Sequence, residues 1–580
     1  MTPVDYFNKP LAIPQKQYEA LRTFFVDKRK AEDVARCFGY RLSAFYSLIR
    51  DFKTSLKTNV SEDFFFKTSK KGRRIKSKTP ALVSLIVALR KKNFSVPDIK
   101  TMLDAKGHTV SEGYILRILK EEGFARLPRR EQKTKISPEC PQIDAPKSRL
   151  LSLQPEKFSS NIPGLLCFLP YLANYDLLTT IEQSLYPETK TIKRTPSLLA
   201  FLALKLSNVR RYSVDDLWCM DRGGGLFARL NVLPKAAWFS SYSHRVTRTM
   251  NLDFLRRLHT IWKSHHLLGD TANLDFTTIP YWGDATHLEQ NWSGKRHHCL
   301  ASMLAVLAQD PDSGLIDYGD TTVLHKDEHA VILEFLDFYK EGQPDDAILK
   351  YLVFDSKFTN YENLGKLDEQ HIKFVTIRRR GKKIIEHITN LPPSHRKKIR
   401  VACAGNTTRT MFVTEEKIFL KGYGKEIRQL AITGHGKLKP ALIITNDFDL
   451  PIETMVRKYC RRWLVEKSIS EQIEFFHLNR VSSSLVIKVD FDFTMTILAH
   501  NLYRLLAMAL ERYSHLTAMS LYEKFIFNSG EIEITDEAIH VRLKKKRHLP
   551  ALLTTMQQYS DVPYPHLDNK KLLFSGMSIS

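Results

Sequence analysis

The sequence predicts a multidomain α/β protein in which helical units come first and a mixed domain with a β-rich insertion follows. In the first 130 residues, apolar residues recur at helical spacing and are interrupted by turn glycines. From about residue 270, short β-branched runs alternate with helical stretches. Residues 381–446 hold short β-branched segments separated by Gly, Asn and Pro, with little helical periodicity. At 580 residues the chain is too long for one core, so we expect three or four domains.

The composition indicates packed globular domains and a polyanionic partner. Hydrophobic residues make up 43% and aromatic residues 11% of the chain, which argues against general disorder. The formal net charge of +25 favours a polyanion, because each Lys or Arg that pairs with a phosphate releases counterions. A basic protein without a particular ligand is the alternative, which charge alone does not exclude.

The cysteines and the N-terminal segment favour a cytoplasmic protein. The seven cysteines are odd in number and form no CxxC pair, so we expect no disulfide framework. His297, His298 and Cys299 resemble part of a zinc site, but no partner cluster follows them. We expect no signal peptide, and no apolar run reaches the roughly 18 residues needed to span a bilayer.

A first helix-turn-helix unit is predicted near residues 16–53. Ala31, Val34 and Ala35 form a short apolar face, Gly39 supplies a turn, and a second apolar helix follows around Phe45. A generic helical hairpin is the alternative.

A second such unit is predicted at residues 80–124. Its third helix is expected to begin at Ser111 as N-cap and to bury Ile115, Ile118 and Leu119. The outer face would carry Tyr114, Arg117 and Lys120, which suits a helix that reads the major groove.

A basic arm separates the two units. Residues 70–78 hold six Lys and Arg residues around Gly72, and Lys71, Arg73 and Arg74 are among them. Arms of this kind follow the minor groove between flanking DNA-reading units. A solvated linker is the alternative, but the two flanking units favour DNA contact.

The middle of the chain is expected to be mostly helical, up to residue 268. Gly223 to Gly225 are three consecutive glycines, and such glycines can cradle a phosphate. Neither a Walker pattern nor a strand before a helix accompanies them, so we expect a tight loop.

Strands and helices alternate after residue 269. ANLDFTTIPYWG, CLASMLAVLAQ and SGLIDYGDTTVL predict three successive strands, EHAVILEFLDFYKEG predicts a helix, and LKYLVFD and HIKFVTIRRR predict two buried strands. Three antiparallel strands, a helix and then parallel strands follow the order of a ribonuclease H-like domain. The expected divisions are a first helix-turn-helix unit at 1–66, a basic linker at 67–79, a second unit at 80–130, a linker at 131–160, a helical domain at 161–268, a ribonuclease H-like domain at 269–380 and 447–515 with a β-rich insertion at 381–446, and a C-terminal region at 516–580.

Three carboxylates are the strongest candidates for chemistry. Asp275 and Asp355 lie at or near the ends of short apolar β-branched runs, where side chains of an α/β sheet point into the ligand-binding crevice. Glu466 follows Tyr459 and Arg462 on an amphipathic helical stretch, at a spacing that places all three on one face. Carboxylates from two strands and a helix suit a hard divalent cation, and two cations about 4 Å apart suit in-line attack on a phosphodiester. An ordinary surface ion pair is the alternative for Glu466.

Four stretches of the sequence resemble those of DDE transposases from bacterial insertion sequences, in particular the group with the Tyr-Arg-Glu-Lys signature. They are DFTTIP, VFDSKFTNYENLGKL with HIKFVTIRRR after it, LIITND, and YCRRWLVE, and the resemblance spans about residues 195–510. It implies a ribonuclease H-like catalytic domain interrupted by a β insertion. It also implies two Mg²⁺ ions, with Mn²⁺ as a substitute, and strand transfer of a transposon end.

The resemblance also assigns roles to residues of this chain. Asp275, Asp355 and Glu466 would be the metal ligands and catalytic residues. Tyr459 and Arg462 would contact phosphates of the transposon end. Lys357 and the arginines from Arg378 to Arg380 are lesser candidates for DNA contact.

Two departures from the group's pattern concern the details of the reaction. The signature Lys would stand seven residues after Glu466, where this chain has Ile473, and His477 is the nearest basic substitute. Some relatives stack a flipped base on a Trp of the insertion, but residues 381–446 contain none. Phe412, Phe419 or Tyr423 would then have to stack instead, or no hairpin step exists.

The sequence therefore predicts a DNA transposase in a bacterial cytoplasm, at the nucleoid. It would bind the inverted repeats of an insertion sequence, cleave the strand, and join the 3′-hydroxyl to target DNA. A homodimer is expected, because two ends must be brought together. A catalytically inactive, domesticated DNA-binding regulator is the main alternative. A nuclease that only hydrolyses is another, whereas no RNA-binding module signature is present.

Overall fold

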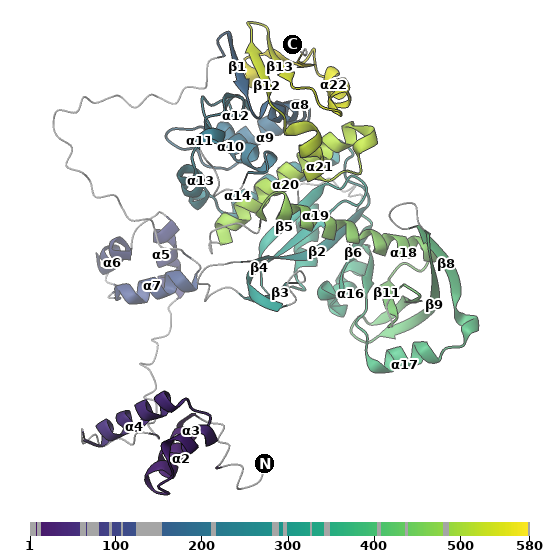
Figure 1. The fold of residues 1–580 in the computed structure, drawn as a ribbon. Helices are drawn as coiled ribbons and strands as arrows, with labels where there is room; N and C mark the ends of the chain where they lie inside the picture. Colours follow the sequence, from purple (N-terminus) through teal and green to yellow (C-terminus); the bar gives the residue numbers. More distant parts are fainter. Residues whose placement is uncertain are drawn as a thin grey trace, which may run out of the picture. The chain divides into compact units, whose positions relative to one another are not determined.

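The chain forms two compact units, Met1–Leu82 and Val83–Ser580 (Figure 1). The computed structural model describes residues 7, 13–57, 65, 80–91, 96–105, 108, 110–122, 124, 153–209, 216–280, 289–293, 298–324, 328–341, 349–402, 408–435, 439–478 and 486–577.

Within the described residues of the first unit, three helices surround a small apolar core. They are α2 (Ile13–Phe25), α3 (Ala31–Cys37) and α4 (Leu42–Lys57). Phe45 and Ile49 of α4 pack on Val34 and Ala35 of α3. Gly39 has a positive φ of 62°, which glycine adopts without a steric penalty, and the chain turns there between α3 and α4. The predicted pair of helices around Gly39 is confirmed.

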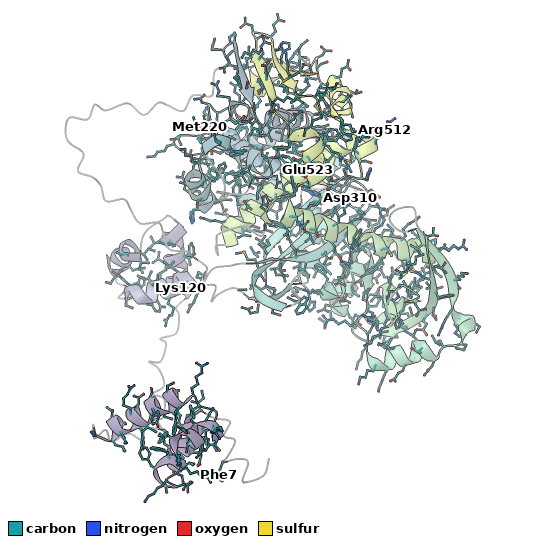
Figure 2. The ribbon with its side chains drawn as sticks, viewed as in Figure 1. Phe7, Lys120, Met220, Asp310, Arg512 and Glu523 are labelled. Carbon is teal, nitrogen blue, oxygen red and sulfur yellow. The ribbon has the colours of Figure 1, made fainter. Side chains whose placement is uncertain are left out.

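Three further helices follow at α5 (Pro80–Lys91), α6 (Val96–Ala105) and α7 (Glu112–Glu121). The Ser111 hydroxyl accepts a hydrogen bond from the Tyr114 backbone N–H at 3.2 Å, so the predicted N-cap is confirmed. The predicted inner residues Ile115, Ile118 and Leu119 are buried. Arg117 is exposed. Lys120 is exposed as well (Figure 2).

A large mixed sheet organises the second unit, with strand order β3-β4-β2-β6-β7-β11-β10-β9-β8 and with β5 paired to β4. Its first part consists of β2 (Thr271–Pro280), β3 (Gln290–Ser293), β4 (His298–Gln309), β5 (Ile316–Val323), β6 (Tyr351–Phe354) and β7 (Lys373–Ile377). β2, β4 and β5 pair antiparallel, whereas β2, β6 and β7 pair parallel. This order of antiparallel and then parallel strands agrees with the sequence prediction, and β3 is an additional short strand.

The β-rich segment extends the same sheet. β8 (Lys397–Ala402), β9 (Thr408–Leu420), β10 (Lys425–Thr433) and β11 (Ala441–Thr445) are joined to it through antiparallel pairing of β11 with β7. The expectation of strands with little helix was wrong at α17 (Lys382–Asn390). This helix forms because Ile384 and Ile388, four residues apart, pack on Ala431 and Leu442 of the sheet.

Helices before and after the sheet in sequence make up much of the remaining core. Those before it are α8 (Leu169–Asn174), α9 (Leu177–Gln183), α10 (Arg194–Leu206), α11 (Asp216–Cys219), α12 (Arg222–Phe227), α13 (Ala236–Tyr242) and α14 (Arg248–Ser264). The long helix α20 (Val486–Ala509) packs on β5, α10 and α14 (Figure 1). The expected tight loop at Gly223 was wrong, because α12 contains all three glycines and the Asp221 carboxylate caps its first N–H groups.

Helices α15 (Val331–Lys340), α16 (Tyr361–Glu369), α18 (Ile452–Arg461) and α19 (Trp463–Glu474) lie around the large sheet. A second sheet has the order β1-β12-β13-β15-β14 and combines β1 (Glu156–Ser160) with the last part of the chain. Its other members are β12 (Gly530–Ile534), β13 (Ala538–Leu543), β14 (Pro563–Tyr564) and β15 (Lys570–Gly576), near α21 (Ala518–Leu521) and α22 (Leu549–Gln557). Within the described residues, no helix combines the length and apolar character that crossing a bilayer requires.

Candidate active site

The topology of the large sheet places Asp275 and Asp355 side by side. β2 and β6 are parallel neighbours, and their pairing ends with Leu274 opposite Phe354. Asp275 is the next residue of β2, and Asp355 is the first residue after β6. Neighbouring strands lie about 4.8 Å apart, and residues at matching positions point to the same face. Two carboxylates separated by 80 positions in sequence therefore share one face, at the point where the strand pairing opens.

The two aspartates have different surroundings. Asp275 lies within β2, is 9% exposed, and accepts a hydrogen bond on Oδ1 from the Phe276 backbone N–H at 2.8 Å. Asp355 directly follows β6 and precedes a short helical turn at Ser356–Phe358. Its side chain makes no capping hydrogen bond to that turn, so the carboxylate is not used to terminate secondary structure.

Arg462 brings the helical carboxylate to the strand carboxylates. Its Nη1 contacts Asp275 Oδ2, and its Nη2 donates to Glu466 Oε1 at 2.6 Å. The guanidinium carbon lies 5.6 Å from the ring centroid of Tyr459. Tyr459, Arg462 and Glu466 thus gather on one side, as their spacing predicts.

The sequence predicted one continuous helix for these residues. The structure divides it into two. α18 ends at Arg461 and α19 begins at Trp463, with Arg462 between them. No Gly or Pro marks this break in the sequence. Arg462 is the residue that joins the two helices and also the one whose side chain joins the carboxylates.

The charges of these groups act on one another. Burial raises the pKa of Asp275 to about 6; Arg462 lowers it, while Glu466 and Asp355 raise it. Burial likewise raises the pKa of Tyr459 to about 12, against the effect of Arg462. Burial alone would lower the pKa of Arg462, but the negative charge of Asp275 and Glu466 holds it above its ordinary value. The guanidinium is therefore charged at any physiological pH.

The residues fit a hard divalent cation by their chemistry. The donors are carboxylate oxygens, the ligands that Mg²⁺ prefers; two of the carboxylates, Asp275 and Glu466, contact one guanidinium, and Asp355 acts electrostatically on Asp275. In the described part of the chain, no three His, Cys, Asp or Glu side chains stand ready to hold a metal ion in the present arrangement. Arg462 supplies the positive charge next to Asp275 and Glu466, and its buried Nε has no hydrogen-bond partner among the described residues.

The remaining predicted DNA-contact residues are dispersed. Lys357 is exposed, and its Nζ lies 6.0 Å from the ring centroid of Phe276, the residue after Asp275. Arg378 donates to Gln429 Oε1 at 2.8 Å and so is engaged with β10. Arg117 is exposed on α7, 3.9 Å from Glu121. Lys71, Arg73 and Arg74 lie outside the described residues.

The two departures from the signature have local structural counterparts. Ile473 is half-buried and packs against the main core, so a charged side chain would be costly at that position. His477 directs its Nε2 to the Asn208 carbonyl at 3.1 Å. In the insertion, Tyr423 is buried, whereas Phe412 and Phe419 are 42% and 64% exposed. Only the two phenylalanines among these three therefore present a ring to solvent.

Asn273 is a residue of this region that the sequence patterns did not single out. It is 1% exposed, and its Nδ2 donates to the backbone carbonyl of Arg461 at 3.1 Å. The period-2 spacing to Asp275 on the same strand was the signal that could have drawn attention to it.

Comparison with known proteins places this site within a family match. Residues 273–502 match the family described as "Transposase DDE domain". The match supports a DDE transposase. It includes the five residues clustered at the candidate site, which are Asp275, Asp355, Tyr459, Arg462 and Glu466. No curated protein matches the chain. Among solved structures, a piggyBac transposase synaptic complex with hairpin DNA aligns at 12% identity and a TM-score of 0.32, covering 71% of this chain and 87% of that one.

Proposed function

We propose that the chain is a DDE transposase of a bacterial insertion sequence, in the group with the Tyr-Arg-Glu-Lys signature. It binds the terminal inverted repeats and performs metal-dependent strand cleavage and strand transfer. One observation carries the proposal: Asp275 of β2 and Asp355, directly after β6, occupy matching positions just past the parallel pairing of these two strands, and Arg462 links Asp275 to Glu466. The family match over residues 273–502 supports the same reading.

Asp275, Asp355 and Glu466 would hold two Mg²⁺ ions, or Mn²⁺ in their place. When bound, such ions supply a nucleophile at neutral pH and stabilise the negative charge that develops on phosphate oxygens. Asp275 lies on a strand, Asp355 directly follows one, and Glu466 lies on a helix, which limits their movement. Near-burial of Asp275 restricts water around its carboxylate and strengthens the electrostatic interactions made there.

Arg462 and Tyr459 would contact the phosphate of the transposon end. The guanidinium has a buried Nε without a partner in the described structure, and its other nitrogens can exchange a carboxylate for a phosphate oxygen. The Tyr459 ring supports the guanidinium from one side. Lys357, exposed and close to Phe276, would contact DNA further along the strand.

The N-terminal unit would bind the ends through α4. Phe45 and Ile49 bury one face of this helix, while Ser43, Tyr46, Ser47, Arg50 and Thr54 form an exposed stripe on another. Tyr46 is 53% exposed, and the side chain of Arg50 is 74% exposed. A polar and basic stripe on the second helix after a turn suits insertion into the major groove. Arg117 on α7 and the basic arm with Lys71, Arg73 and Arg74 would add phosphate contacts.

Single substitutions test the proposal. Asp275→Ala, Asp355→Ala and Glu466→Ala should each reduce Mg²⁺-dependent cleavage of end-containing DNA by at least about 10³-fold, because removal of a metal ligand removes most of the charge stabilisation. Binding of the same DNA in a mobility-shift assay should persist. A purified variant that still cleaves at the wild-type rate would refute the assignment.

A catalytically inactive, domesticated DNA-binding regulator is the second candidate function. The observation that favours it is Ile473, a half-buried apolar residue where the signature has Lys. Wild-type protein with Mg²⁺ and end-containing DNA separates the two, because a regulator would bind without producing nicks. Detection of joined products, beyond cut ones, separates a transposase from a nuclease that only hydrolyses.

Two ends must come together for transposition, so we propose a homodimer in the synaptic complex and a bacterial cytoplasmic location at the nucleoid. Mass photometry of the protein with end-containing DNA should show two chains per complex, each with one end. One chain per complex throughout the reaction would contradict this part of the proposal.

A further inference from the structure

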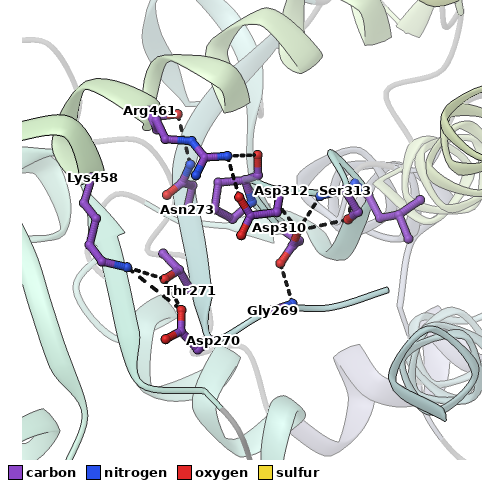
Figure 3. A network of polar contacts seen from close by, with 11 residues as sticks. Gly269, Asp270, Thr271, Asn273, Asp310, Asp312, Ser313, Lys458 and Arg461 are labelled. Atoms are coloured by element: carbon purple, nitrogen blue, oxygen red, sulfur yellow. Dashed lines mark hydrogen bonds and ion pairs between the residues drawn. The ribbon is translucent and has the colours of Figure 1, made fainter. Parts of the chain in front are cut away.

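A polar network lies at the junction of α18 and α19 (Figure 3). Its Arg461 directly precedes Arg462, which contacts Asp275 and Glu466. The network connects Lys458 and Arg461 of α18 to the beginning of β2 and to the turn between β4 and β5. None of its side chains belongs to the five clustered residues. The network therefore has no part in the proposed chemistry itself and calls for another role.

The hydrogen-bond pattern of the helix changes at Arg462. The Arg462 N–H donates to the Tyr459 carbonyl at 3.1 Å, and the Val465 N–H donates to the Arg462 carbonyl at 3.0 Å. Both bonds reach three residues back, whereas an α-helix uses four. In a regular helix the Val465 N–H would have bonded to Arg461, so the carbonyl of Arg461 is released.

The Asn273 side chain donates a hydrogen bond to this released carbonyl. Its Nδ2 donates to the Arg461 oxygen at 3.1 Å (Figure 3). Asn273 is 1% exposed, and its Oδ1 has no partner among the described residues. A buried amide is costly without hydrogen bonds, so this contact offsets part of that cost. Asn273 and Asp275 stand two positions apart on β2 and so project from the same face.

The side chains of Lys458 and Arg461 attach α18 on both sides of this contact. Lys458 Nζ donates to the Thr271 hydroxyl at 2.8 Å and lies 4.0 Å from the ring centroid of Tyr351. Arg461 Nη2 donates to the Pro311 carbonyl at 2.6 Å and to Asp312 Oδ1 at 2.7 Å. One turn of α18 is therefore attached to the start of β2, to β6, and to the turn after β4.

Asp310 keeps that turn in place (Figures 2 and 3). Its Oδ1 accepts from the backbone N–H groups of Asp312 and Ser313 at 2.9 and 2.7 Å. Its Oδ2 accepts from the Gly269 N–H at 2.7 Å, just before β2. The acceptors for Arg461 are thus fixed relative to the strand that carries Asn273 and Asp275.

We infer that Asn273, with Lys458 and Arg461, is a positioning residue that fixes the break between α18 and α19, so that Arg462 and Glu466 face Asp275. The break matters because a 3₁₀-type turn has 3.0 residues rather than 3.6, which rotates each following residue by about 20° relative to an α-helix. Without the contact from Asn273, α19 would lose the rotation that directs Glu466 to the cluster. The consequence for metal binding rests on the proposed function. The positioning of the helix break by Asn273, Lys458 and Arg461 does not.

A matched pair of substitutions tests this inference in the full-length protein. Asn273→Leu removes the donor and keeps the number and branching of the side-chain heavy atoms. Asn291→Leu is the control, because Asn291 is also 1% exposed, also donates through Nδ2 to a backbone carbonyl (Ser302, 2.9 Å), and also has an Oδ1 without a partner among the described residues. Asn291 lies on β3 and pairs with Leu300 of β4. This position on β4 is several residues from Leu307, which pairs with Asp275.

Hydrogen–deuterium exchange is the first readout. Amides of residues 460–468 should exchange at least about 10-fold faster in Asn273→Leu than in wild type, and at the wild-type rate in Asn291→Leu. Equal exchange of this segment in all three proteins would overturn the inference. If Asn273→Leu does not fold, Arg461→Met, at a side chain 41% exposed, should produce a smaller increase in the same segment.

Mn²⁺ affinity is the second readout. Only the Mn²⁺ binding that is lost in the Asp275→Asn variant is assigned to this site. Asn273→Leu should weaken it by about 10- to 100-fold, as loss of a supporting contact behind a metal ligand does, and Asn291→Leu should leave it unchanged. Faster exchange with undiminished Mn²⁺ affinity would overturn the positioning role. Wild-type protein that takes up no Mn²⁺ would refute the proposed function instead. Hydrogen–deuterium exchange would then still decide whether Asn273 fixes the helix break.

Discussion

The balance of charge around Arg462 is the central property at the scale of single residues. Asp275 is nearly buried and close to two further carboxylates, so its ionised form is disfavoured by burial and by like charge. Arg462 offsets part of this, but one guanidinium does not balance the charge of Asp275, Glu466 and Asp355, so the cluster is net negative once all three are ionised. Such a cluster gains stability from any additional cation, which is the condition under which a divalent metal binds.

Arg462→Met should raise the pKa of Asp275 above its value of about 6, because the arginine lowers it. The pKa of Asp275 in the folded protein already exceeds the ordinary 3.8, so ionisation of this group opposes folding. Its contribution to stability therefore falls as the pH rises from about 4 to about 6, and in the variant this fall should extend to higher pH. NMR titration of ¹³C-carboxyl-labelled aspartate measures the change, with Arg462→Lys as the control that keeps the charge. An unaltered Asp275 titration in Arg462→Met would contradict the account.

At the scale of secondary-structure elements, the sequence predicted what local pattern determines. The β2, β4 and β5 segments are apolar runs bounded by turns, and the Ser111 cap follows from its side chain alone. The carboxylates Asp275 and Asp355 could be selected because they follow or interrupt such runs. The register of the two strands could not be predicted, since the pairing of Leu274 with Phe354 joins residues 80 apart.

Elements that depend on distant contacts were missed. α17 contains adjacent β-branched residues and is stabilised as a helix by its apolar stripe on Ala431 and Leu442. The break at Arg462 has no Gly or Pro to announce it, and its released carbonyl is satisfied by Asn273 from another strand. β1 pairs with β12, so a strand at residue 156 is determined by a segment after residue 530. Local propensity cannot predict structure that is determined in this way.

Helix α4 makes a testable contribution at this scale. Arg50→Ala should weaken binding of duplex DNA and reduce the slope of log affinity against log salt by about 0.9, the loss of one phosphate contact. Fluorescence anisotropy at several salt concentrations measures the slope. Lys16→Ala is a control on α2, where the ammonium lies 4.7 Å from the Tyr40 ring centroid. Unchanged affinity in Arg50→Ala, or an equal loss in both variants, would argue against α4 as the DNA-contacting helix.

At the scale of the whole molecule, buried polar contacts join segments that are far apart in sequence. Lys205 of α10 pairs with Asp492 of α20 at 2.7 Å, and each side chain is 3% exposed. The same α20 packs on β5, so this pair joins α10 to the helix that covers the sheet carrying Asp275. Desolvation makes a buried pair sensitive to loss of one partner, because the other charge is left without compensation.

Lys205→Met should therefore lower the free energy of unfolding by about 3–5 kcal/mol, and the double variant Lys205→Met with Asp492→Leu should recover much of that loss. Lys157→Met is the control, because the Lys157–Glu531 pair is largely exposed and should contribute less than about 1 kcal/mol. Chemical denaturation of the four proteins measures these differences. Equal destabilisation by the two lysine variants would contradict the role assigned to the buried pair.

The convergence of Asp275, Asp355 and Glu466 on one divalent-metal site is most directly tested by electron paramagnetic resonance of Mn²⁺ added to metal-free, full-length protein. The account predicts tight Mn²⁺ binding with coupling between two neighbouring ions, and loss of the coupled signal in each of Asp275→Asn, Asp355→Asn and Glu466→Gln. Wild-type Mn²⁺ binding in any one of these folded variants, or binding of isolated ions without coupling, would contradict it.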